Sequence, residues 1–284
     1  NFEAKLRADR AFYRSQRDLM LAALARAGLV MGESRYLEAA RRAADFVRRA
    51  LTGSDGRLLA RWREGEAAHP GKLDDYALYA WGLLELYGAT FMTEYLDEAA
   101  RLAGLMLDQF FDGEMGGFFP YAAEGEQLIS RTKEVYDGAM PSGNSVAALV
   151  LSRLARLTGE MRWRAAAELQ LGYLAGGMQG YPMGHSFALL VCLEELWPSA
   201  ELVCATVADE APQVLMDVLR QGGEPNLTVL LKTPKNALDL ARIAPFTEPY
   251  PCPEEGARYY LCRNGACAQP VETIQQLLKL LDKD

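Results

Sequence analysis

The side chains best suited to acid–base chemistry stand at the start of two predicted helices. Asp74 and Asp75 open one apolar helix, and Asp137 precedes Ser142, a residue type that commonly caps the first turn of a helix. Free backbone N–H groups and the helix dipole attract carboxylates and polar ligands at such ends. A pair of carboxylates with unequal pKa values is what glycoside chemistry requires. We therefore predict Asp75 and Asp137 as catalytic residues, and Asp74 as a substrate-binding residue.

The alternative for these carboxylates is structural. First-turn aspartates stabilise a helix dipole without any chemistry, and Asp137 precedes Gly138 as in many turns. Asp74 and Asp75 diverge by about 100° on a helix, so at most one of them can point squarely into a common cavity. Both interpretations stay open at this point.

A histidine is the third catalytic candidate. Epimerisation beside a carbonyl group needs a base and an acid on opposite faces of the sugar, and His185 stands at the start of a further predicted helix. Its alternative role is also structural. The other histidine, His69, falls in a loop, where we expect it to be solvated. Two histidines exclude a His-rich metal site in this chain, and we predict no metal and no cofactor.

Five further side chains are candidate substrate ligands. Aromatic rings can stack on the faces of sugars, whereas basic side chains in the loop before Asp137 could bind an anionic sugar. The competing interpretations are core packing for the aromatic residues and solvated surface charge for the basic ones. The candidates are Tyr76, Arg131, Lys133, Tyr136 and Asn144.

Composition limits the classes of partner. The chain of 284 residues has 30 basic and 38 acidic residues and a net charge of −8, which argues against nucleic acid and anionic membranes as partners. Apolar runs such as Leu19–Leu24 fall short of the roughly 20 residues that cross a bilayer. Five cysteines in so long a chain favour reduced thiols and a cytoplasmic location. Because residue 1 is Asn, we expect the native N-terminus to lie upstream.

The cysteines Cys262 and Cys267 form a closely spaced pair near the C-terminus. Without a second pair, their spacing does not indicate a zinc site. We predict two structural free thiols, with a disulfide or a redox-active pair as the alternative.

Helical hairpins repeat along the first two thirds of the chain. Each unit contains an apolar helix, a short turn, an amphipathic helix and a long polar loop. The apolar helices are predicted at Leu19–Met31, Asp74–Gly88 and Ser142–Thr158, the amphipathic ones at Tyr36–Leu51, Glu94–Phe111 and Arg162–Leu174, with His185–Trp197 opening a fourth unit and a further helix at Phe2–Tyr13.

Such hairpins stack as two concentric rings, so the fold class is mainly α: a partial α/α toroid at residues 1–198. All the long loops then lie at one end, beside the starts of the inner helices, and loops commonly carry functional residues. Asp74, Asp75, Asp137 and His185 are expected to meet there.

The composition changes near Pro198. Three β-rich runs alternate with short helical patterns, which predicts a small, mostly parallel α/β domain at residues 199–284. It carries no glycine-rich phosphate-binding signature. The predicted strands are Glu201–Val207, Asn226–Lys232 and Ala257–Cys262.

Several motifs together resemble one known family. In chain order, they are Leu73–Ala77 with Leu83–Thr90, Gly116–Phe119 leading to Arg131–Ser145, and Tyr260–Pro270. These residues resemble the C-terminal half of the large thioredoxin-domain-containing proteins of the spermatogenesis-associated family. The resemblance covers nearly the whole chain. One departure lies at Arg14–Asp18, where the family's Asp-Asp-Lys and Trp-Asn-Gly segments are missing.

The resemblance implies a fold more firmly than a reaction. Family members pair a thioredoxin-like domain with an (α/α)6 barrel similar to N-acylglucosamine 2-epimerases and six-hairpin glycosidases. The resemblance therefore implies that this chain is a carbohydrate-processing domain, which would be an epimerase, isomerase or glycosidase that acts on a sugar-like ligand. The alternative is a catalytically degenerate barrel that binds a ligand or partner for a thioredoxin-like domain, for which Cys262 and Cys267 could be a redox pair.

Overall fold

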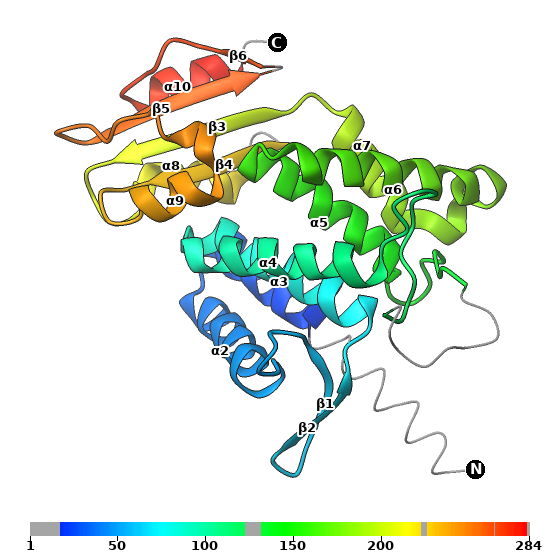
Figure 1. Cartoon of the computed structure of the whole chain (residues 1–284). Helices are drawn as coiled ribbons and strands as arrows, with labels where there is room; N and C mark the ends of the chain where they lie inside the picture. The colour runs from blue at the N-terminus through cyan, green and yellow to red at the C-terminus, as the bar shows by residue number, and fades with distance from the viewer. Residues whose placement is uncertain (1–17, 123–131, 223–225, 264, 283–284) are drawn as a thin grey trace.

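The computed structural model describes residues 18–122, 132–222, 226–263 and 265–282. The predicted helix at Phe2–Tyr13 and the candidate Arg131 lie outside these residues. Within them, helical hairpins form an arc, and a small sheet with its own helices lies along one side of it (Figure 1). The predicted fold class, a mainly α partial toroid followed by a small α/β unit, is confirmed.

Apolar helices form the inner layer of the arc. They comprise residues 18–31, α3 (Leu73–Thr90), α5 (Gly143–Thr158) and α7 (Ser186–Leu196). Neighbouring members of this layer pack in sequence, α3 on α5 and α5 on α7. Because α3 and α5 are covered by helices on several sides, nearly every residue along them is apolar or small.

Amphipathic helices form the outer layer. They are α2 (Ser34–Ala50), α4 (Thr93–Phe110) and α6 (Met161–Gly180), each burying one stripe. The turn between α3 and α4 is short because Phe91 adopts a left-handed conformation, and Gly159 does the same between α5 and α6. The inner helices therefore all begin at the end where the long connections lie.

Two of these long connections contain short elements. A hairpin of β1 (Leu59–Arg63) and β2 (Glu66–Pro70) precedes α3. The 3-10 helix η1 (Pro182–His185) leads directly into α7.

The second unit is a four-stranded sheet in the order β4-β3-β5-β6. Its strands are β3 (Ala200–Thr206), β4 (Leu227–Lys232), β5 (Ala257–Arg263) and β6 (Ala266–Cys267), connected through α8 (Gln213–Gln221), α9 (Ala237–Ile243), η2 (Pro245–Thr247) and a final α10 (Ile274–Leu281). Its buried residues belong to the same hydrophobic cluster as those of α3 and α5, so one core runs through both units. The boundary at residue 198 stays a prediction.

The prediction of a mostly parallel sheet is wrong. Only the pairing of β3 with β4 is parallel among these strands, whereas β5 runs antiparallel to both β3 and β6. The connection after α9 brings the chain to the far end of β3, where Val207 donates a backbone hydrogen bond to Gly256. The chain enters β5 from that end and must run back along β3.

The prediction of free thiols at Cys262 and Cys267 is also wrong. These residues face each other across β5 and β6 and form a disulfide, with their Cα atoms 4.0 Å apart. Strand pairing brings together two sulfur atoms that the sequence places five positions apart. The other three cysteines, Cys192, Cys204 and Cys252, are free. In the described part of the chain, no helix is both long and apolar enough to cross a bilayer.

The close approach of the inner helices predicts opposite effects for two glycines of α3. A Cβ atom on Gly82 would lie 2.1 Å from Leu21 Cδ2, whereas one on Gly88 meets nothing within 4 Å. Gly82→Ala should lower the free energy of unfolding by about 1–3 kcal/mol because it overpacks this contact. Gly88→Ala, the matched control, should raise it by up to about 1 kcal/mol through helix propensity. Urea unfolding of the two variants tests this, and equal effects would contradict the packing described.

Candidate functional site

Asp137 holds the starts of two inner helices together. One carboxylate oxygen accepts a hydrogen bond from the backbone N–H of Ser142 at 2.8 Å, just before α5. The other accepts from Phe187 and Ala188, at 2.9 and 3.1 Å, in the first turn of α7. The side chain is buried. These contacts support the structural alternative for a residue predicted to be catalytic.

Asp75 also serves the backbone. Its Oδ2 atom accepts a hydrogen bond from the Lys72 N–H at 2.9 Å, which closes the first turn of α3. The side chain of Asp75 is buried in the first turn of α3. Asp75 and Asp137 therefore lie at the starts of α3 and α5, at the same end of the arc, but both bind backbone groups.

His185 packs against an outer helix. Its Nδ1 atom lies 2.9 Å from the carbonyl oxygen of Tyr181, so a neutral ring carries its proton there and leaves Nε2 unprotonated. A Cβ atom on Gly177 of α6 would lie 2.6 Å from Nε2. The imidazole ring therefore occupies space that is free only because residue 177 has no side chain. Among the described residues, Nε2 has no hydrogen-bond partner. The placement supports the structural role that was the alternative for His185.

Asp74 has a raised proton affinity. It is only partly buried, and it accepts a hydrogen bond from the N–H of Gly143 at the start of α5. Burial raises the pKa of Asp74 to about 6, and the negative charges of Asp75 and Glu134 add to the effect. Asp74 and Asp137 thus accept hydrogen bonds from the adjacent amides of Gly143 and Ser142.

A pair of exposed tyrosines lies beside this helix start. Tyr136 and Tyr181 are 62% and 49% exposed, and their rings are parallel with centroids 6.5 Å apart. The backbone N–H of Asp137 donates to the carbonyl of Gly184 at 2.7 Å, which fixes one segment against the other. Tyr136 is one of the predicted substrate ligands, whereas Tyr181 was not predicted. The available signal was the position of Tyr181 directly before Pro182 and the helix that follows.

Three other predicted binding residues have structural partners. The hydroxyl of Tyr76 accepts from the N–H of Leu58, and its ring is buried. The amide of Asn144 is buried too, and it exchanges hydrogen bonds with the N–H and carbonyl of Phe118.

The third, Lys133, forms an ion pair of 2.8 Å with Asp112 and lies over the rings of Phe119 and Tyr173. This ammonium group, with two backbone N–H groups, lowers the pKa of Asp112 to about 2. The three side chains shape the long connections rather than line an open surface.

A cavity of about 460 Å³ lies at the other end of α3 and α5, where α8 and β4 close it. Arg153 lies in the polar wall of this cavity, where it forms ion pairs with Glu85 at 2.6 Å and with Glu194 at 3.1 Å. Arg156 adds a further contact to Glu194. None of these residues was predicted as part of a site. Within the described ranges, no cluster of three or more His, Cys, Asp or Glu side chains could hold a metal ion.

Comparison with known proteins places the chain among relatives of similar sequence. It is 30% identical to human Spermatogenesis-associated protein 20 over 274 residues, which covers 93% of this chain and 35% of the human protein. The predicted resemblance to this family is confirmed. An uncharacterized protein of Caenorhabditis elegans is 26% identical over 281 residues, covering 95% of this chain and 37% of the relative. The chain therefore spans about a third of the length of the curated relatives that it matches.

Two solved structures share part of the fold. The cellobiose 2-epimerase of Spirochaeta thermophila matches 55% of this chain and 41% of its own, with 22% identity and a TM-score of 0.44. A GH76 α-mannanase of Bacteroides thetaiotaomicron matches 55% and 42%, with 17% identity and a TM-score of 0.45. No family model matches the sequence.

The hydrogen bonds of Asp137 predict a large loss of stability in Asp137→Ala. Removing the carboxylate leaves the N–H groups of Ser142, Phe187 and Ala188 without this acceptor. We expect the free energy of unfolding to fall by about 3 kcal/mol or more, as measured by urea denaturation. Asp108→Ala, on the exposed side of α4, should change it by less than about 0.5 kcal/mol. Equal losses of unfolding free energy in the two variants would contradict a structural role for Asp137.

The raised pKa of Asp74 predicts a specific dependence of stability on pH. The folded state binds the proton near pH 6 and the unfolded state near 3.8, so this stabilisation is complete below about pH 4 and is lost as pH rises through 6. The loss should reach about 2 kcal/mol, allowing for partial exposure. Asp74→Asn should lack it, whereas Asp108→Asn should keep the wild-type slope. Urea denaturation from pH 4 to 7.5 measures the difference, and a wild-type slope in Asp74→Asn would refute the assignment.

Proposed function

We propose that this region binds a carbohydrate-like ligand where the inner helices begin. The observation that carries the proposal is the Asp74 carboxyl group at the first turn of α5, together with an exposed pair of parallel tyrosines, one of which directly precedes Asp137 at the same helix start. Carboxyl oxygens accept hydrogen bonds from sugar hydroxyls, while flat rings pack on the apolar faces of sugar rings. The start of α5 adds the positive end of its helix dipole.

In this proposal, Asp74 is the general acid or base. A carboxyl group with a pKa of about 6 is present in both protonation states near neutral pH, so it can donate and accept a proton. Glu134 is the proposed second carboxylate, because its charge contributes to the raised pKa of Asp74. An acid with a raised pKa paired with a second carboxyl group is the arrangement that glycoside hydrolysis uses, and sugar isomerisation also needs a proton donor and acceptor.

A second candidate is ligand binding without turnover. It is favoured by the hydrogen bonds of Asp75 and Asp137 and by the packing of His185, which commit all three predicted catalytic residues to the fold. In that case, the same surface would hold a ligand or partner for a thioredoxin-like domain of a longer protein. Asp74 would then contribute a hydrogen bond rather than a proton transfer.

One set of variants tests the proposal and separates the two candidates. A panel of mono- and disaccharides is screened by saturation-transfer NMR, and any binder is then followed for hydrolysis or isomerisation. Tyr136→Ala and Tyr181→Ala should each weaken binding at least tenfold because the stacking faces are lost. Trp197→Ala removes an exposed aromatic ring near the other end of α7 and should leave binding unchanged.

The reaction itself is tested with Asp74→Asn. In an enzyme, this variant should bind the sugar but lose at least a hundredfold in turnover. Binding without turnover by the wild-type chain would select the second candidate. The absence of binding to every sugar in the panel, with the fold intact by circular dichroism, would refute the carbohydrate proposal.

A further inference from the structure

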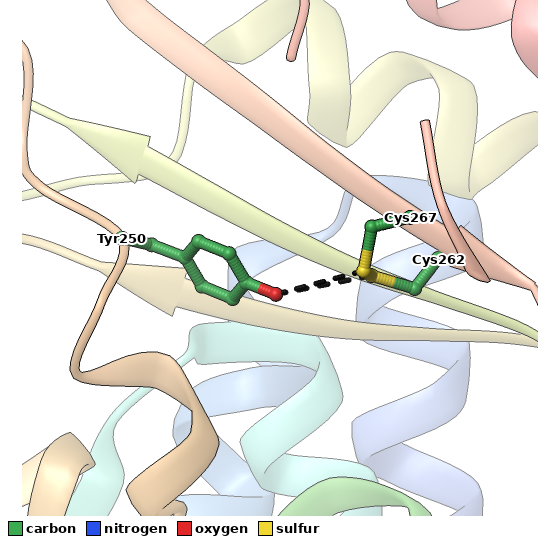
Figure 2. The surroundings of a disulfide bond; sticks show 3 residues. All are labelled: Tyr250, Cys262 and Cys267. Atoms are coloured by element: carbon green, nitrogen blue, oxygen red, sulfur yellow. Dashed lines mark hydrogen bonds between the residues drawn. A yellow bond between two sulfur atoms is a disulfide. The ribbon is translucent and has the colours of Figure 1, made fainter. Parts of the chain in front are cut away.

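A disulfide lies at the exposed edge of the sheet. Cys262 and Cys267 occupy opposed positions on β5 and β6, and β6 is a two-residue edge strand (Figure 2). Cys267 is exposed, whereas Cys262 is half-buried. The sulfur atom of Cys267 therefore lies on the side from which a second thiol can approach.

The disulfide adds little to the fold that the sheet does not already supply. It closes a short ring, and the stabilisation from loop closure is smallest for short rings. Backbone hydrogen bonds already hold this edge, including the one from Ala268 N–H to the carbonyl of Leu261. The buried strands β3 and β4 lie on the other side of β5 and do not depend on the disulfide. The sheet can therefore keep its structure when this bond is broken.

A tyrosine hydroxyl points at the two sulfur atoms. The Oη atom of Tyr250 lies 3.8 Å from the Sγ atoms of both Cys262 and Cys267 (Figure 2). The ring of Tyr250 is stacked on that of Tyr260, with centroids 4.4 Å apart, which holds the hydroxyl in this position. A hydroxyl can donate a hydrogen bond to a thiolate that forms when the disulfide opens.

We propose that Cys262–Cys267 is a thiol–disulfide exchange site for a dithiol reductant, and that Tyr250 is its positioning residue. A thiolate of the reductant attacks Sγ of Cys267 and forms a mixed disulfide, while the bond to Cys262 breaks. The electron pair of that bond leaves on Sγ of Cys262, which accepts a hydrogen bond from Tyr250 and then a proton from solvent. The site is independent of the carbohydrate surface proposed above.

The second step completes the exchange. The second thiol of the reductant loses its proton. The resulting thiolate attacks the reductant sulfur atom that is bonded to Cys267, and the thiolate of Cys267 leaves. That thiolate is protonated, and the reductant leaves as an oxidised disulfide. Two electrons and two protons pass from the reductant to the chain. The chemistry is shared by small dithiols and by proteins with a Cys-x-x-Cys pair.

Reduction of the intact chain tests the proposal. The wild-type protein is incubated at pH 7 with dithiothreitol or with a Cys-x-x-Cys protein reductant, trapped with iodoacetamide and analysed by mass spectrometry. We expect complete reduction of Cys262–Cys267 with unchanged far-UV circular dichroism. Faster reduction by the protein at equal thiol concentration would identify a protein partner, and equal rates would identify a small dithiol. Resistance to both reductants, or unfolding on reduction, would overturn the proposal.

The role of Tyr250 has a matched control. Tyr250→Phe keeps the ring and removes the hydroxyl, so the rate constant for reduction should fall roughly fivefold. Tyr260→Phe removes the neighbouring hydroxyl, which lies 3.4 Å from the carbonyl of Pro251, and should leave the rate unchanged. A Cys252→Ser background removes the free thiol closest in sequence to Tyr250. Equal rates for Tyr250→Phe and the wild-type chain would overturn the assignment of Tyr250.

Discussion

The carboxylate of Asp137 is the constraint on which the polar end of the arc depends. It joins the amide before α5 to two amides of α7, whose positions in the sequence are about fifty residues away. A buried charge of this kind is tolerated only when several donors surround it, and backbone N–H groups at helix starts are well suited to that task. Since Tyr136 adjoins Asp137 and Tyr181 directly precedes η1, which leads into α7, the same contacts also hold the two rings side by side.

Much of the helical architecture could be predicted from the sequence because it follows from periodicity. Helices that are covered on several sides, such as α3 and α5, are apolar along their whole length, whereas α4 shows a stripe. Short turns between them are marked by residues such as Gly159. These local signals are enough to order the hairpins and to place their long connections at one end.

The candidate site was only partly predictable, because it depends on orientation. Asp74 and Asp75 are neighbours in the sequence, and the rotation of about 100° per residue along a helix points them in different directions. Asp75 closes the first turn of α3, whereas Asp74 reaches the start of α5. The amides of Phe187 and Ala188 meet Asp137 only after the chain has folded back through α5 and α6. No pattern near Asp137 indicates these partners. The direction of β5 and the disulfide on it are likewise set by where the chain enters the sheet.

The ion pairs of Arg153 have a mechanical consequence for the arc. They connect α3, α5 and α7 through Glu85 and Glu194 at the end opposite Asp137. Partly buried charge pairs are screened much less by salt than exposed ones are, so this attachment persists where surface pairs weaken. The helices α5 and α7 are thus attached to each other at both ends, through Asp137 at their starts and through Arg153 and Glu194 near their other ends, so separating them would break a carboxylate contact at each end.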